Sequence, residues 1–252
     1  MRVVRLSLAP VKGLALHHPD EVFLGRDGIP GDRRFYLTDA DGRLVNDKTC
    51  GEIVQVRPAV ANGSLSLAFP DRASVDGEVA LGAPVETSFY GRPVTGRLVN
   101  GPFSDALSGF AGRPLRLVQA DEQGSAIDRV HVVSIVSDGS LRALARHAGV
   151  DAVDGRRFRM NVELEGCDEH EEDSWIGREV AVGEARIRVT GPVGRCVVTT
   201  RNPETGVPDL DTLKALAGYR TLKEGKSFGC GVCGDVLEPG TVCVGDSLVR
   251  GD

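Results

Sequence analysis

The chain has 252 residues, of which 41% are hydrophobic and 26% charged, and its formal net charge is −6. This composition is ordinary for a soluble globular protein, and the acidic balance argues against general binding to nucleic acid or to a membrane surface. No apolar run approaches the roughly 20 residues that cross a bilayer, and Pro10, Lys12 and Gly13 interrupt the first apolar stretch, unlike in a secretory signal. We therefore expect a cytoplasmic protein with neither a nucleic acid nor a membrane as partner.

Short apolar or alternating runs follow one another along most of the chain, and Asp-Gly and Asn-Gly turn signals separate several of them. The pattern predicts strands within 2–10, 33–45, 53–60, 64–69, 85–90, 93–99, 114–120, 179–192, 196–200 and 241–249. Helical periodicity is rarer. It predicts helices at 103–112, at 137–149 between a Ser137 or Asp138 cap and Gly149, and at 209–220 after Asp209 or Asp211.

These elements predict a mainly β fold with a few helices, in the α+β class. The chain is strand-rich up to about residue 118 and mixed after it. We therefore predict two domains, at residues 1–118 and 119–252.

Basic side chains stand at several turns and strand starts of this acidic chain. Each of them alone is typical of a solvated charge or a structural ion pair, but together they could line one anion pocket, because arginine at such positions holds phosphate through paired N–H donors. They are Lys12, Arg33, Arg34, Arg156, Arg157, Arg159 and Arg195.

The stretch "GCDEHEEDSW" resembles a metal cluster at first sight. Consecutive carboxylates are more often a solvated loop, and a single His170 gives a zinc site little to build on. We expect Trp175 to pack against a domain surface and not to stack on a ligand.

Six cysteines in a chain of this length, without a signal peptide, favour free thiols over disulfides. Cys230 and Cys233 form a lone C-x-x-C with Cys243 further on, and we interpret them as unpaired thiols, with a redox pair as the alternative. For Cys196 in "GPVGRCVVTT", local chemistry favours a buried thiol that fills the core. The alternative is a working thiolate, favoured by Arg195 and by a turn that could expose the side chain.

Taken in order, several segments resemble the MOSC family, the molybdenum cofactor sulfurase carboxy-terminal domain, preceded by its amino-terminal β-barrel-like domain. The layout is similar to that of mitochondrial amidoxime-reducing components and YcbX-type proteins. The segments are "LAPVKGLAL", "GIPGDRRFYLTDADGRLV", "VSDGSL", "RRFRMNVELEG", "EEDSW", "GRCVVTTRNPETG", "LDTLKALAGYR" and "FGCGVCGDVLEPGTVCVGD". A β-barrel-like fold for both domains follows from the resemblance.

The resemblance implies a bound molybdenum cofactor, molybdopterin, with Cys196 as the catalytic cysteine and protein ligand of the metal. A soft thiolate suits a metal that already holds dithiolene sulfurs. The same resemblance implies that a group of polar residues holds the phosphate and polar edge of the pterin: Lys12, Arg33, Arg159, Asn161 and, in the same shell, Arg195. Pyridoxal phosphate binding belongs to the family in general, and no residue here is assigned to it.

Three departures from the family pattern stand out. Gly13 replaces a serine or other small polar residue, Lys48 lies in a segment that more commonly carries arginine or glutamine, and Cys230 and Cys233 have no assigned role. No flavin motif is visible, and we expect no ferredoxin-like iron–sulfur domain of the kind that YcbX-type chains carry.

The implied activity is oxygen-atom removal from an N-hydroxylated or similar small-molecule substrate by a molybdenum-dependent oxidoreductase. Electrons would come from a separate partner, a ferredoxin or a flavin reductase. One alternative is a molybdenum-independent sulfur-handling protein, a persulfide carrier or carbon–sulfur lyase that uses Cys196. Another is a carrier that delivers the cofactor without turnover.

Overall fold

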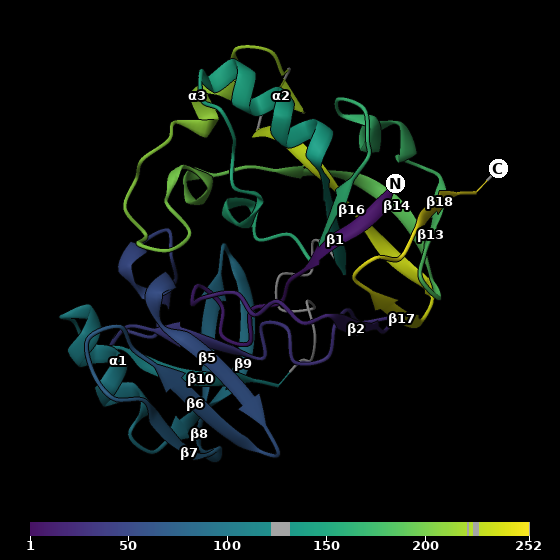
Figure 1. Cartoon of the computed structure of the whole chain (residues 1–252). Coiled ribbons are helices and arrows are strands. Elements are labelled where there is room, and N and C mark those ends of the chain that lie inside the picture. Colours follow the sequence, from purple (N-terminus) through teal and green to yellow (C-terminus); the bar gives the residue numbers. More distant parts are fainter. Residues whose placement is uncertain (122–131, 221, 224–226, 252) are drawn as a thin grey trace.

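Two lobes rich in strands make up the molecule (Figure 1). The computed structural model describes residues 1–121, 132–220, 222–223 and 227–251. Strands make up 44% of the structure, which also has three α-helices in its described part, so the predicted mainly β class is confirmed.

An eight-stranded, nearly closed sheet forms one lobe. Its strands run in the order β1 (Arg2–Leu6), β12 (Val162–Glu165), β11 (Val133–Ser137), β16 (Ser227–Glu238), β14 (Ala185–Gly194), β13 (Glu179–Val182) and β18 (Leu248–Arg250), with β15 (Leu222–Lys223) beside β16. A bridge between Arg2 and Ser247 brings the two ends of this order together, which gives the sheet its barrel form. Val, Leu and Ile side chains fill its interior around Trp175.

The other lobe contains a five-stranded and a three-stranded sheet. The first has the order β4 (Leu44–Val45), β3 (Phe35–Thr38), β10 (Arg116–Ala120), β9 (Arg92–Asn100) and β8 (Ala80–Phe89), and the second the order β5 (Arg57–Ala61), β6 (Ser64–Ala68) and β7 (Val75–Glu78). Helix α1 (Phe103–Ala111) and the 3-10 helix η1 (Gly51–Gln55) share this lobe's core with Phe35, Leu37 and Leu117.

The first residues of the chain belong to the barrel lobe. Strand β1 pairs antiparallel with β12, and β2 (Glu21–Leu24) pairs with β17 (Gly240–Cys243). Val3, Leu6, Val22 and Leu24 lie in the barrel's core. The division at residue 118 stays a prediction. These pairings show that the first strands of the chain belong to the lobe that the second half of the chain builds.

All three predicted helices form, but the third spans only Thr212–Ala217 of the predicted 209–220. Helix α2 (Asp138–Ala148) begins after Ser137, whose hydroxyl accepts a bond from the backbone N–H of Ser140 at 3.1 Å, and ends at the left-handed Gly149. Helix α3 (Thr212–Ala217) is capped by the Asp211 carboxylate. None of the described helices is long and apolar enough to cross a membrane.

Several local interpretations were wrong, among them the strand predicted from residue 53, where η1 still runs to Gln55. The β-branched run at 196–200 is not a strand but the 3-10 helix η5 (Val197–Thr200). The acidic stretch is not merely a solvated loop: it contains the 3-10 helix η4 (Glu171–Trp175), in which Glu172 is fully buried and accepts bonds from the hydroxyls of Ser137 and Ser140. Burial raises the pKa of Glu172. Trp175 is a core residue.

Candidate functional site

A cavity of about 210 Å³ lies between segments of both lobes. Loops after β1, before β3 and after β4 line it from one side, and the segments before β12 and after β14 from the other. Every residue that the sequence resemblance selects lines this cavity: Lys12, Arg33, Arg159, Asn161, Arg195 and Cys196. Lys48, from the segment that departs from the family pattern, lines it as well. The structure thus brings the predicted set together, while the roles of its members stay predictions.

Cys196 presents an exposed thiol to this cavity. It follows the last residues of β14 and precedes η5, and its backbone carbonyl accepts bonds from the N–H and the hydroxyl of Thr199, at 3.1 and 3.0 Å. The local interpretation of Cys196 as core filling is therefore wrong, because β14 ends at Gly194, two residues earlier, and the cysteine is exposed. A fixed backbone and an open sulfur are what a ligand or nucleophile requires.

Arg195 is buried at the edge of the cavity, and its guanidinium is held by groups of the protein. Its guanidinium donates to the carbonyls of Cys230 at 2.6 and 2.8 Å and Phe158 at 3.1 Å, and contacts Met160 Sδ at 3.0 Å. Burial lowers the pKa of Arg195 to about 10, so the side chain keeps its charge at neutral pH. These bonds fix the strand end that carries Cys196.

Two of the predicted arginines have left-handed backbone conformations, with φ of 52° at Arg33 and 53° at Arg159. A third cavity residue, Tyr90, has φ of 51°. Such conformations are uncommon outside glycine and cost of order 1–3 kcal/mol, and they cluster at functional sites because the surroundings must enforce them. Three of the five such residues in the described chain line this one cavity.

Asp32 lies beneath these residues as a fully buried carboxylate. It accepts bonds from the backbone N–H of Ala9 at 2.8 Å, from Asn161 Nδ2 at 3.3 Å and from Arg33 Nη1. Arg33 in turn donates to the carbonyl of Arg159 at 3.4 Å. The carboxylate therefore joins a loop of one lobe to a strand start of the other.

Asn161 uses its amide inside this network. Its Oδ1 accepts from the N–H and the hydroxyl of Ser134, at 3.1 and 2.9 Å, and its Nδ2 also donates to the carbonyl of Ser7 at 3.3 Å. With its amide bonded in this way and only 3% of its surface exposed, Asn161 serves chiefly to fix the cavity wall.

Gly13 has φ of 89°, and a Cβ atom there would lie 3.0 Å from both Asn46 Cα and Asp47 N. The structure therefore explains the departure from the family pattern: backbone conformation and close approach both require glycine at this position.

Positive charge dominates the cavity wall. Lys12, Arg33, Lys48, Arg157, Arg159 and Arg195 face a single lining carboxylate, Asp47, which pairs with Arg159 at 3.4 Å. Arg157 is neutralised by Asp209 at 2.6 Å, and Arg33 by the buried Asp32. The remaining excess of cations, in a chain of net charge −6, suits a phosphate-bearing ligand.

Sequence reasoning missed Asp32, Asp47 and Tyr90. The Asp32-Arg33 pair was visible as "GDRR", but nothing local indicates that its carboxylate is buried. Cys230 and Cys233 are free thiols packed in the core beside α2 and α3. Burial raises the pKa of Cys230 to about 12, which makes it a poor nucleophile.

Fold and site together define a two-lobed β-barrel protein with an exposed thiol in a cation-lined cavity. The chain belongs to the MOSC family: the MOSC domain model matches residues 126–249 and the MOSC N-terminal β barrel domain model matches residues 1–99. The predicted family is confirmed.

Curated relatives carry two names. The chain is 26% identical to the molybdenum cofactor sulfurase of Drosophila ananassae over 86% of this chain and 30% of that protein. It is 38% identical to the human mitochondrial amidoxime-reducing component 1 over 45% of this chain and 35% of that protein, and 24% identical to the mouse protein over 98% and 81%. The chain therefore spans about a third of the fly protein.

Among solved structures, the YuaD protein of Bacillus subtilis shares 15% identity over 98% of this chain and 93% of that one, with a TM-score of 0.47.

Proposed function

We propose that this protein binds a molybdenum cofactor and uses it to reduce N-hydroxylated or related N-oxygenated small molecules. One observation supports this most directly: an exposed cysteine thiol opens into a cavity whose wall carries six cationic side chains and one carboxylate. A soft sulfur ligand beside a phosphate-binding wall is the donor set that a molybdenum–pterin group requires. The residues present therefore fit the group.

Cys196 would supply the protein ligand to the metal. Lys12 and Lys48 would neutralise the phosphate, and Arg33, whose charge is paired with Asp32, would add N–H donors beside them. Arg159, tied to the carbonyl of Leu14 at 2.7 Å, would fix the polar edge of the pterin. Arg195 and Asn161 would act as positioning residues, since their polar groups are engaged within the protein. When bound, the cofactor supplies a metal centre for oxygen-atom transfer, and a separate protein would supply the electrons.

The test is metal and pterin analysis of protein purified from a host that makes the cofactor. We expect stoichiometric molybdenum and pterin in the wild type, and reduction of an N-hydroxylated amidine with a chemical reductant. Cys196→Ser should lose the reduction, whereas the matched control Cys243→Ser, at a partly exposed cysteine outside the cavity, should keep it. Wild-type protein free of both molybdenum and pterin would refute the proposal.

A second candidate is sulfur handling by Cys196 without molybdenum. The exposed thiol favours it, as does the name of the fly relatives, molybdenum cofactor sulfurase. The buried Cys230 and Cys233 give it no support. This candidate predicts a mass gain of one sulfur atom on the peptide that contains Cys196, with sulfide release in a metal-free preparation. Bound cofactor that is transferred to an acceptor without any substrate reduction would indicate a carrier.

A further inference from the structure

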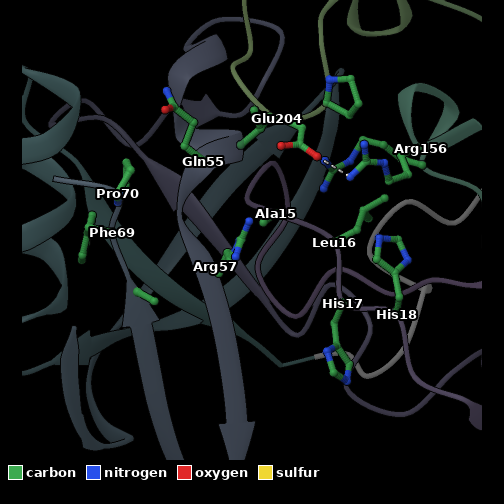
Figure 2. A pocket seen from close by; sticks show the side chains of 14 residues that line it. Ala15, Leu16, His17, His18, Gln55, Arg57, Phe69, Pro70, Arg156 and Glu204 are labelled. Carbon is green, nitrogen blue, oxygen red and sulfur yellow. Dashed lines mark hydrogen bonds and ion pairs between the residues drawn. The ribbon is translucent and has the colours of Figure 1, made fainter. Parts of the chain in front are cut away.

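A second and larger cavity, of about 550 Å³, lies next to the cysteine site. Segments far apart in the sequence line it: the loop at 15–18, the stretch 54–57 at the start of β5, the end of β6 at 68–70, and the segments around 156–159 and 203–204. Figure 2 shows Phe69 and Pro70 on one side in this view, Arg156 and Glu204 on the other, and Arg57 between them. Arg159 lines both cavities.

Cationic and titratable side chains prevail in this second cavity. Arg57, Arg156, Arg159, His17 and His18 face one lining carboxylate, Glu204. That carboxylate is already bound by Arg156 at 2.9 Å, and Arg156 also holds Asp154 at 2.7 Å. The local balance is thus opposite to that of the chain as a whole.

Arg57 carries most of the unneutralised charge. It is exposed at the first position of β5, and it forms no ion pair with any residue that the structure describes. A guanidinium offers a fork of N–H donors that matches carboxylate and phosphate oxygens. Its position inside a walled cavity makes it an anchor for such a group.

The opposite wall is apolar and fixed. The buried Phe69 ring packs on Phe110 at 5.6 Å and lies beneath Arg72 at 5.4 Å, so it is held in place from behind. Pro70 lies beside Phe69, Val54 and Ala68 also line the cavity, and Leu16 lies on the Arg156 side (Figure 2). Convergent polar groups opposite an apolar wall are the usual form of a small-molecule site.

We propose that this cavity binds a small organic anion, with a carboxylate or phosphate group on Arg57 and an apolar body against Phe69 and its neighbours. The inference does not depend on molybdenum, because none of its groups is assigned to the metal. Because Arg159 lines both cavities, this ligand would lie beside the cysteine site.

The test is an NMR titration of the full chain with phenyl phosphate, which carries both parts of the proposed ligand. The ring resonances of His17 and His18, assigned from His17→Gln and His18→Gln, report on this cavity, since neither residue lines the cysteine site. We expect saturable shifts of both rings, and binding weaker by about tenfold in Arg57→Ala, since a charge-assisted contact is lost. Inorganic phosphate, which lacks the apolar part, should bind more weakly than phenyl phosphate.

Two controls separate this cavity from its surroundings. Arg116→Ala removes another exposed strand arginine that lines neither cavity, and Lys12→Ala removes a cation of the cysteine site; both should leave the histidine shifts unchanged. The proposal is overturned if the shifts do not saturate, if Arg57→Ala leaves them unaffected, or if Lys12→Ala abolishes them. All of these measurements use metal-free protein, so failure of the molybdenum proposal leaves them interpretable.

Discussion

Replacing Asp32 by Asn tests whether a buried carboxylate holds the cysteine site together. The change keeps the shape of the side chain but removes its charge and places an amide among the N–H donors of Ala9, Arg33 and Asn161. Breaking a buried ion pair costs about 3–5 kcal/mol, because a charge is left without its partner. The Asp32 side chain is 0% exposed and that of Arg33 16%, so water reaches the arginine and lowers the expected loss to about 2–4 kcal/mol.

Chemical denaturation measures this loss as a fall in the free energy of unfolding. Asp71→Asn is a matched control, since Asp71 also precedes and pairs with an arginine, Arg72, but on the surface, with 51% of its side chain exposed. Surface pairs contribute little, so the control should unfold almost like the wild type. Equal losses in the two variants would show that Asp32 is not the buried link that the structure describes.

Three further predictions follow from single features of the fold. Gly13→Ala should lower the free energy of unfolding by roughly 1–3 kcal/mol more than Gly91→Ala does, because Gly91 has the same φ of 89° but open space around it. Thermal unfolding measures the difference, and equal effects would exclude the contact with Asn46 and Asp47. Alkylation of the native protein, followed by mass spectrometry, should show that Cys196 reacts well before Cys50, Cys167 and Cys230. Cys196 is exposed, whereas burial raises the pKa of each of the other three thiols to about 12. Early modification of these three buried thiols would contradict their placement in the core. Burial raises the pKa of Glu172 above its ordinary 4.5, so the folded protein binds a proton at this carboxyl more tightly than the unfolded chain does. The contribution of Glu172 to the free energy of unfolding should therefore fall as the pH rises through and above 4.5. Denaturation of wild type and Glu172→Gln measures this, and a difference between them that does not change with pH would refute it.

Features that depend on neighbouring residues were predictable from the sequence. Ser137, Gly149 and Asp211 mark helix ends because capping involves residues only a few positions apart. Most of the alternating runs became strands for the same reason, since period-two patterning is local.

Features that depend on distant partners were not predictable in this way. Glu172 is buried because Ser137 and Ser140, more than thirty positions earlier, supply hydroxyl donors to it. The run at 196–200 has strand-forming residues, yet it turns into η5, where Thr199 bonds back to the carbonyl of Cys196. The convergence on the cysteine site followed only from family resemblance, since composition and spacing carry no information about it.

The first strands of the chain belong to the barrel lobe, and this explains how residues far apart in the sequence reach one cavity. Strands β1 and β2 are the first elements of the chain, yet they complete the barrel lobe through β12 and β17. The segment between β1 and β2, which contains Leu14, and the segment after β2, which contains Asp32 and Arg33, are therefore both attached to barrel strands. Asp32 then bonds Asn161, 129 positions away, and Leu14 accepts from Arg159, 145 positions away. Both bonds tie these segments to the residues just before β12, so the position of the cationic wall relative to the thiol depends on strand pairing in the barrel.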